Sequence, residues 1–259
     1  HVLLVDTDLP AGAHTNMQPY AGRGWCIMEF NASGLVKDDS ALISLKGLTG
    51  REEDLDQVRK NGKAARQPPV APAEFASTLE AGVASGATKF TNSGDVGLVG
   101  KIYGWAFAAE MAGAISLFYV ELGWDDAQMI TLCKALRAAH AGGGLRKLEQ
   151  LSLRGNKMGD GAMAALIALL EEGAMPNLRM LYLNDNQISD AGVATLALAI
   201  MGGALPSCQV VRPSRTFPVV DLRNNPGSDA PAKEALASRE RILAWASATF
   251  AGASPGTLY

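Results

Sequence analysis

The sequence predicts an α/β protein with an incomplete α/β segment at its start and a short array of strand–turn–helix repeats after it. Three observations support this prediction. The first residues form an apolar run, followed by a polar loop and a helical pattern. The pattern LxLxxN ends at Asn156 and again, 30 residues later, at Asn186. Each copy precedes an Ala/Leu-rich stretch with apolar residues at helical spacing.

Length and composition describe a packed protein. The chain has 259 residues, of which 48% are hydrophobic and 19% are charged, so it can bury a core and is too apolar to be disordered. With 23 Lys and Arg against 26 Asp and Glu, the net charge of −3 offers no electrostatic attraction to a nucleic acid or an anionic membrane. We therefore expect neither of these partners.

Cysteines, histidines and motifs narrow the chemistry further. The cysteines at positions 26, 133 and 208 form no CxxC pair, so we expect a reducing compartment and a cytoplasmic protein. Three histidines and no phosphate-binding glycine motif lead us to expect no metal site and no cofactor. The most apolar window, Gly104 to Leu122, contains Glu110 and many small residues, which favours a buried element over a membrane span.

The amino-terminal part begins with a short apolar run, Val2 to Val5, which predicts a buried strand. A helix is expected from about Gly24, after a loop that contains proline and glycine. On that helix Glu29 lies four residues after Trp25, so the two side chains share one face. We expect Trp25 to pack in the core and Arg23 to pair with Glu29.

The order of strand, loop, Tyr20 and the Trp25-Cys26-x-x-Glu29 motif resembles Toll/interleukin-receptor (TIR)-like domains. The resemblance implies that this segment follows an inner parallel strand. In enzymatically active members the matching glutamate cleaves the glycosidic bond of NAD, which would assign that role to Glu29. The resemblance covers only Val2 to Val36, and glycosidic cleavage also needs walls that bind base and ribose. A structural, arginine-paired Glu29 is therefore the other interpretation.

Between this segment and the repeats, the sequence predicts a proline-rich connection and helices. Residues Gln67 to Pro72 contain three prolines and read as an extended surface loop. Pro72 is typical of the first turn of a helix. A second helix is expected over Val96 to Phe107, with apolar residues at helical spacing.

The repeats have a simple physical explanation. In LxL the two leucines face inward and the residues between them face outward, because strand side chains alternate. The asparagine suits a turn in which its amide bonds unpaired backbone groups, so Asn156, Asn186 and Asn225 are expected to stack as a structural ladder. Asn225 belongs to a poorer third copy after an insertion, and residues Ile115 to Leu122 form a degenerate first copy without the asparagine.

These motifs resemble the leucine-rich repeat family and, in their length and helix content, its ribonuclease-inhibitor-like subclass. The resemblance covers about Ile115 to Leu236 and implies a short solenoid with one strand and one helix per repeat. It also implies a protein partner on the concave face. The whole layout, from the Trp-Cys-x-x-Glu segment to the repeats, also resembles multidomain proteins of algae and other protists.

The outward strand positions form the expected binding surface. A tyrosine flanked by arginines lies at its centre, a combination that is common in protein interfaces. A solvated sheet face with one incidental tyrosine is the alternative. The expected surface residues are Gln150, Ser152, Arg154, Met180, Tyr182, Asn184, Val219, Asp221 and Arg223.

We expect five segments and one main function. The segments are a partial α/β segment (1–58), a linker or extended Pro-rich region (59–88), a helical connector or cap (89–114), the repeats (115–240) and a C-terminal helix or tail (241–259). The expected function is a protein–protein interaction module or scaffold in signalling. The alternative is an NAD-cleaving hydrolase with Glu29 as catalytic carboxylate and the repeats as sensor.

Overall fold

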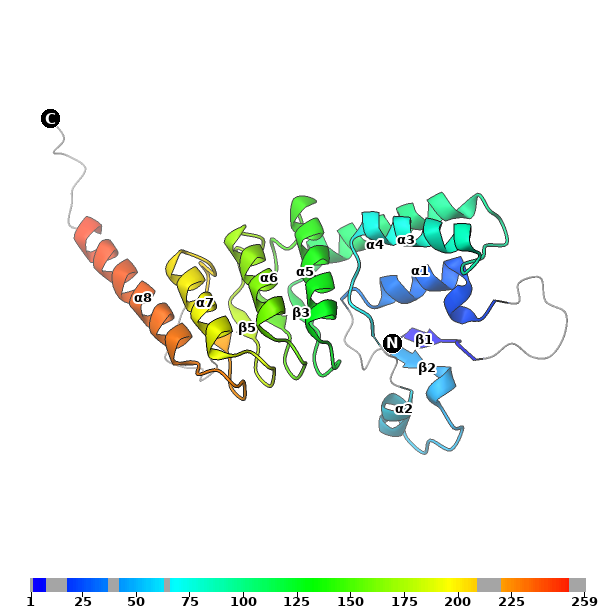
Figure 1. Cartoon of the computed structure of the whole chain (residues 1–259), viewed down its shortest axis with the longest axis horizontal. Helices are drawn as coiled ribbons and strands as arrows, with labels where there is room; N and C mark the ends of the chain where they lie inside the picture. The colour runs from blue at the N-terminus through cyan, green and yellow to red at the C-terminus, as the bar shows by residue number, and fades with distance from the viewer. Residues whose placement is uncertain (1, 8–17, 37–41, 63–65, 209–219, 252–259) are drawn as a thin grey trace.

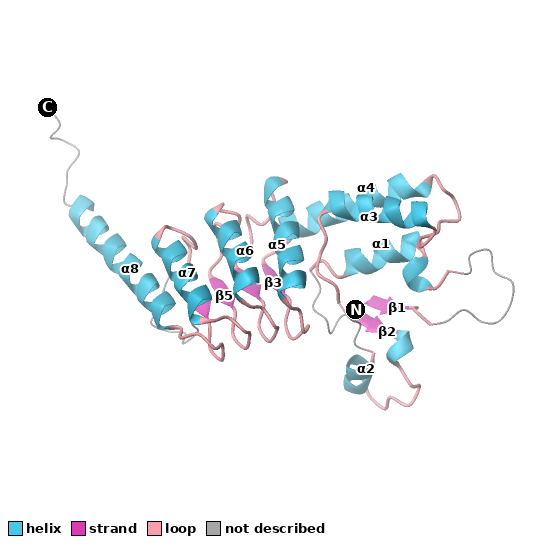
Figure 2. Cartoon of the chain, in the orientation of Figure 1, coloured by secondary structure: helices cyan, strands magenta, loops and turns pink. Residues whose placement is uncertain are grey.

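A computed structural model describes residues 2–7, 18–36, 42–62, 66–208 and 220–251. The chain forms an elongated molecule, with an α/β and helical part at one end and a row of repeats that leads to the C-terminus at the other (Figure 1). Helix and strand alternate regularly in the row of repeats (Figure 2).

The amino-terminal part contains a two-stranded parallel sheet. Strand β1 (Val2–Leu4) pairs with β2 (Leu42–Ser44), and helix α1 (Gly24–Ser33) crosses over between them. Such a crossover is what parallel pairing requires. Leu4 and Leu42 form a small buried cluster against Tyr20 and Phe30. The expected strand and helix are therefore present, and the strand ends at Leu4.

Two expectations about α1 are wrong. Trp25 is 36% exposed and donates its indole N–H to Asp95 Oδ2 at 3.0 Å, so it lies outside the core. The buried face of α1 consists of Gly24 and Met28, one helical turn apart, and Trp25 is rotated away from it. Arg23 does not pair with Glu29, because its Nε donates to the Gln18 carbonyl at 2.8 Å.

Three helices follow the small sheet. They are α2 (Leu55–Asn61), α3 (Pro72–Ser85) and α4 (Asp95–Gly113). Pro72 begins α3 as expected, and the rings of Phe75 and Tyr103 stack with centroids 4.0 Å apart, which holds α3 against α4. The region 59–88 is therefore not an extended linker throughout, since α3 fills about half of it with a packed helix.

Arg66 links the amino-terminal part to the first repeat. It is 3% exposed, and its Nε and Nη2 both donate to the Gly34 carbonyl, at 2.9 and 2.7 Å. Its Nη1 donates to the Phe118 carbonyl at 2.6 Å, and the guanidinium lies 4.4 Å from the Tyr119 ring centroid. Trp124 donates to the Arg66 carbonyl at 3.1 Å. Five guanidinium N–H groups in a fixed fork make arginine suited to such a junction.

The repeats form a four-stranded parallel sheet whose strands follow chain order, with the helices on one side. The strands are β3 (Ser116–Phe118), β4 (Gln150–Ser152), β5 (Met180–Tyr182) and β6 (Val220–Asp221). The helices are α5 (Asp126–Ala141), α6 (Asp160–Glu171), α7 (Asp190–Met201) and α8 (Ala230–Ala251). The expected boundary between 240 and 241 is wrong, because α8 runs through it without a break.

Each asparagine of the pattern joins its own turn to the preceding repeat. Asn186 donates to the Leu153 and Leu183 carbonyls, both at 3.0 Å, and accepts from the Met158 N–H at 3.1 Å. Asn156 bridges to the first repeat in the same way, and so does Asn225 to the repeat of Asn186. These amides satisfy backbone groups that the short strands leave unpaired.

The turn before each asparagine position requires a left-handed backbone. The residues there are Glu121, Gly155, Asp185 and Asn224, with φ between 55° and 72°. Glycine, asparagine and aspartate tolerate this region best. At Gly155 a Cβ would also lie 2.7 Å from Glu121 Cγ, so glycine is required by contact as well.

Helix α4 closes the open end of the repeat core. Its buried Phe107 and Met111 belong to the same hydrophobic cluster as the repeat leucines. The Met111 carbonyl also accepts the Leu145 N–H at 3.0 Å. Each repeat buries its hydrophobic face only against a neighbouring element. The first repeat, which lacks the asparagine, therefore depends on α4 to cover its open side.

Candidate functional site

The strand face of the repeats is defined here as the outward side chains of β3 to β6 and the residues directly after them. Besides the row of Ser116, Gln150 and Met180, it presents two further rows of side chains. The parallel register aligns Phe118, Ser152, Tyr182 and Asp221 in the first row. In the second row Asn184 lies between Arg154 and Arg223, as the hydrogen bonds that continue the sheet show. Strands lie about 4.8 Å apart, so the four strands give a face about 15 Å wide.

Three residues expected to be exposed on this face are buried instead. They are Ser152 (5% exposed), Asn184 (7%) and Asp221 (2%). Ser152 is short and lies between the rings of Phe118 and Tyr182 on neighbouring strands. Long arginine side chains cover Asn184 and Asp221 in a similar way. Arg154 and Arg223 flank Asn184 on the neighbouring strands, and Arg223 follows Asp221 by two residues. Alternation gives the direction of a side chain, and neighbouring strands decide its exposure.

The other expected residues lie where alternation places them. Arg154 and Arg223 are exposed, and Tyr182 is half-buried. Gln150 and Met180 are half-buried and directly opposite each other in the register. Val219 lies outside the described residues.

A hollow of about 460 Å³ opens at the second row. It contains residues that the sequence reasoning did not select, because they belong to the turns after the strands. The lining residues are Arg154, Tyr182, Asn184, Asp185, Asp221, Arg223 and Asn224. Phe118 was also missed, although its alternation with Leu117 in the degenerate first repeat was a usable signal.

Both arginines of the hollow are held by carboxylates. Arg154 bonds Glu121 Oε1 at 2.9 Å and Asp185 Oδ2 at 3.4 Å. Arg223 binds Asp221 through Nη2 and Nε, at 2.6 and 2.9 Å. Such paired guanidinium groups hold the acceptors of the hollow in place.

Two carboxylates of the hollow have lowered pKa values. A hydrogen bond from Asn224 Nδ2, at 2.7 Å, is the main cause that lowers the pKa of Asp185. Burial alone would raise the pKa of Asp221, but the hydrogen bonds from the side chain and backbone of Arg223 outweigh it and lower the pKa. Both groups are therefore anionic near neutral pH.

One polar atom at the floor of the hollow has no hydrogen-bond partner within the described part of the chain. Asn184 Nδ2 donates to Asp185 Oδ2 at 2.6 Å, which fixes the amide orientation and leaves Oδ1 as a buried acceptor. A buried acceptor without a donor costs about 1–3 kcal/mol. Asn184 Oδ1 is therefore an unsatisfied buried acceptor among the residues of the hollow.

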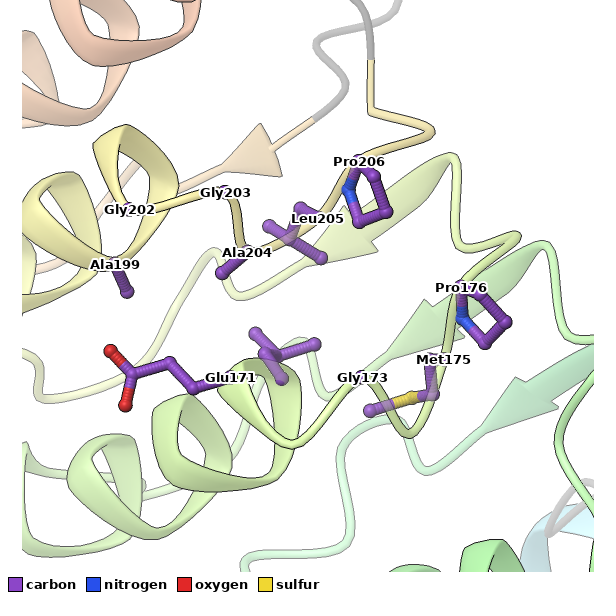
Figure 3. A pocket seen from close by; sticks show the side chains of 11 residues that line it. Glu171, Gly173, Met175, Pro176, Ala199, Gly202, Gly203, Ala204, Leu205 and Pro206 are labelled. Carbon is purple, nitrogen blue, oxygen red and sulfur yellow. The ribbon is translucent and has the colours of Figure 1, made fainter.

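Glu29 lies far along the chain from this face and is exposed on α1. Burial, followed by the negative charges of Cys26 and Glu29, raises the pKa of Tyr20 to about 12. Burial and then Glu29 also raise the pKa of Cys26, which makes its thiol a weak nucleophile at neutral pH. Glu29 lines neither the hollow on the strand face nor a smaller hollow between α6 and α7, which Figure 3 shows.

Within the described ranges there is neither a metal site of clustered side chains nor a helix suited to cross a membrane. No group of three or more His, Cys, Asp and Glu side chains there is arranged to hold a metal ion. None of the described helices combines the length and apolarity that crossing a bilayer requires.

Comparison with protein-family models gives a match within the repeat row. Residues 144–166 and 174–197 match the model described as Leucine Rich repeat. A comparison with curated proteins gives no match. The two matched segments contain β4 and β5, the middle strands of the sheet, and the first halves of α6 and α7. The strand, turn and helix that recur in both segments agree with this match, so residues 144–197 are similar to leucine-rich repeats.

Proposed function

We propose that this chain is a protein–protein interaction module and that the strand face of its repeats contacts the partner. The observation that carries the proposal is the hollow on this face, with the unpartnered Asn184 Oδ1 at its floor and Tyr182 at its wall. Tyrosine and arginine are the residue types most enriched where binding energy concentrates. Leucine-rich repeats generally mediate contacts between proteins, which supports the same conclusion.

The residues of the site also indicate which chemical groups the partner presents. The hollow is lined by two arginines paired with two carboxylates, so it offers hydrogen-bond donors and acceptors side by side to a polar group of the partner. Phe118 and Tyr182 lie two strands apart, about 10 Å, with the small Ser152 between them. The two rings give the face an apolar part to which an apolar side chain of the partner can pack.

The strand face is small compared with a stable interface. Specific complexes bury about 800 Å² on each partner, which is more than four short strands provide. The partner must therefore also contact the turns or the amino-terminal part, and the repeats alone are expected to bind in the micromolar range. The 30-residue spacing and the 12-residue helices α6 and α7 support the ribonuclease-inhibitor-like subtype within this proposal.

Selection from a displayed peptide library tests the proposal without a known partner. Binders selected on the full chain are measured against three proteins: the wild type, Tyr182→Ala and Leu198→Ala. Leu198 is 74% exposed on α7 and serves as the matched control on the helix side. We expect Tyr182→Ala to weaken the binders about tenfold or more and Leu198→Ala to leave them unchanged. Binders whose affinity is unchanged in Tyr182→Ala would refute the assignment of this face.

The NAD-cleaving alternative has no comparable support, because Glu29 is exposed beside Tyr20 and Cys26 and lines no hollow described here. We therefore expect the chain to leave NAD intact. Chromatography for free nicotinamide checks this, and turnover lost in Glu29→Ala would restore the alternative.

A further inference from the structure

Helix α4 is covered on one side only. α1 and α3 pack against it, and near its C-terminal end it enters the core of the repeats (Figure 1). Its buried side chains follow one another at four-residue intervals and mark the covered side; they are Val99, Tyr103, Phe107 and Met111. The opposite side of the helix is exposed.

The exposed side carries mostly apolar residues. We define the α4 stripe as Leu98, Lys101, Trp105, Ala108, Ala109 and Ala112, all of which are exposed and three or four residues apart along one helix face. Leu98 is 46% exposed and Trp105 is 68% exposed. Ile115, which is 59% exposed, lies two residues beyond the end of the helix. Large apolar side chains gathered on one face mark a site of association, and tryptophan is among the residues that contribute most to binding.

The two halves of the α4 stripe differ in size. Leu98 and Lys101 lie in the N-terminal half, whereas the C-terminal half carries only alanines. Trp105 lies one residue past the middle of the helix, and the stripe is symmetrical in spacing about it. Leu98 and Ala112 lie seven residues on either side of Trp105, and Lys101 and Ala109 lie four residues on either side. The large half and the small half therefore have the same length.

This arrangement makes the α4 stripe complementary to itself. If two copies of α4 pack antiparallel across a twofold axis at Trp105, Leu98 of one copy faces Ala112 of the other, and Lys101 faces Ala109. A twofold interface requires this reciprocity, because residue i contacts residue j and residue j contacts residue i. Large side chains that face small ones also let two helices approach to about 8–10 Å. In a parallel pair the large residues would collide and the alanines would leave a gap.

The charge on the α4 stripe favours the same orientation. Each copy contributes one cation, Lys101, which lies four residues from Trp105. In the antiparallel pair the two ammonium groups lie on opposite sides of the axis, about 12 Å apart along the helix, which exceeds the screening length of about 8 Å at physiological salt. In a parallel pair they would lie side by side. The methylene groups of Lys101 can cover the alanines of the other copy while the ammonium group stays in water.

We propose that the α4 stripe joins two copies of this chain into an antiparallel, twofold-symmetric dimer with Trp105 beside the axis. A 19-residue helix is about 28 Å long and a helix face is about 10 Å wide, so the stripe covers about 280 Å² on each copy. This area is below the roughly 800 Å² that each partner buries in a stable complex, so we expect a dissociation constant of about 10–100 µM. The α4 stripe shares no residue with the strand face, and a dimer therefore presents two strand faces.

Sedimentation equilibrium of the full chain measures the dimer. We expect the wild type to change from monomer to dimer between roughly 1 and 300 µM, and Trp105→Ala to raise the dissociation constant about tenfold or more. Leu198→Ala is the matched control, because it also removes an exposed apolar side chain, 74% exposed on α7, and it should leave the dissociation constant unchanged. A monomeric wild type overturns the proposal and leaves the stripe to a different protein. A dimer of unchanged strength in Trp105→Ala overturns it as well.

A pair of charged substitutions tests the antiparallel orientation. Leu98→Glu and Ala112→Lys are each expected to weaken the dimer, because each places a charge against an apolar surface of the other copy. The variant with both substitutions is expected to regain about fivefold or more in affinity, since each carboxylate then faces an ammonium group twice in the dimer. Within one helix the two positions lie 14 residues or about 21 Å apart, so the recovery cannot arise inside one copy.

No recovery in the double variant overturns the antiparallel dimer. Circular dichroism shows whether each variant is folded, which we expect because all substituted side chains are exposed. Tyr182→Ala is expected to leave the dimer unchanged, since that residue belongs to the strand face. The dimer and the proposed partner on the strand face can therefore fail independently of each other.

Discussion

Replacing Asn186 with alanine measures what the asparagine of the pattern contributes to the fold. The side chain is 6% exposed, accepts from the Met158 N–H and donates to the carbonyls of Leu153 and Leu183. It also donates to the Asn184 carbonyl at 3.3 Å, which keeps a bond from the Gly155 N–H at 3.0 Å. The mutation does not affect the other three partners equally. Leu153 keeps a bond from Asn156 at 2.9 Å and Leu183 keeps one from Asn225 at 2.9 Å, whereas the fully buried Met158 N–H loses its amide acceptor.

The expected cost follows from this difference. An unpaired buried N–H costs about 1–3 kcal/mol, and each lost bond to a carbonyl that keeps a second partner costs about 0.5–1 kcal/mol. We therefore expect Asn186→Ala to lower the free energy of unfolding by about 3 kcal/mol. The half-buried Asn225→Ala is expected to cost about 1 kcal/mol, since water reaches its partners.

Urea unfolding followed by far-UV circular dichroism provides the measurement. Asn177→Ala is the matched control, because that side chain also bonds the preceding repeat, at 2.6 Å to the Arg146 carbonyl, but is exposed. A loss for Asn186→Ala that is no larger than for Asn177→Ala would refute the reasoning. In that case the asparagine pattern reflects turn geometry rather than buried hydrogen bonds.

Three further predictions concern other parts of the chain. The folded-state pKa of Asp221 is lowered, so its ion pair stabilises the protein above the unfolded pKa near 3.9, and this stability is lost as the pH falls through the folded pKa. Asp221→Asn should therefore remove part of the acid dependence of the urea midpoint. An unchanged pH profile would contradict this prediction. Burial raises the pKa of Cys133 and Cys208 to about 12, so at pH 8 a thiol reagent should label Cys26 first and the other two only after unfolding, as mass spectrometry can show. Arg66→Lys keeps the charge but loses the fork that joins Gly34 to Phe118, so we expect about 2–4 kcal/mol of destabilisation in the urea assay, and wild-type stability would disprove the role of the fork.

The repeats were predictable from the sequence because their signal is local. Leucines at alternate positions, an asparagine three residues after the second leucine and a helical stretch all fall within one 30-residue window. The structure buries Leu151, Leu153, Leu181 and Leu183 almost completely, as this pattern requires. The degenerate first copy was also recognisable, since Leu117 occupies the position of Leu151 in the register.

The parts that sequence reasoning missed depend on contacts between distant segments. Arg66 lies in a segment that reads as a polar, proline-rich connection, yet its partners are 32 and 52 residues away. Ser152 and Asn184 point outward as expected, but their burial is decided by the size of side chains on neighbouring strands. The exposed position of Trp25 was not predictable for the same reason, because its hydrogen-bond partner Asp95 lies on another helix.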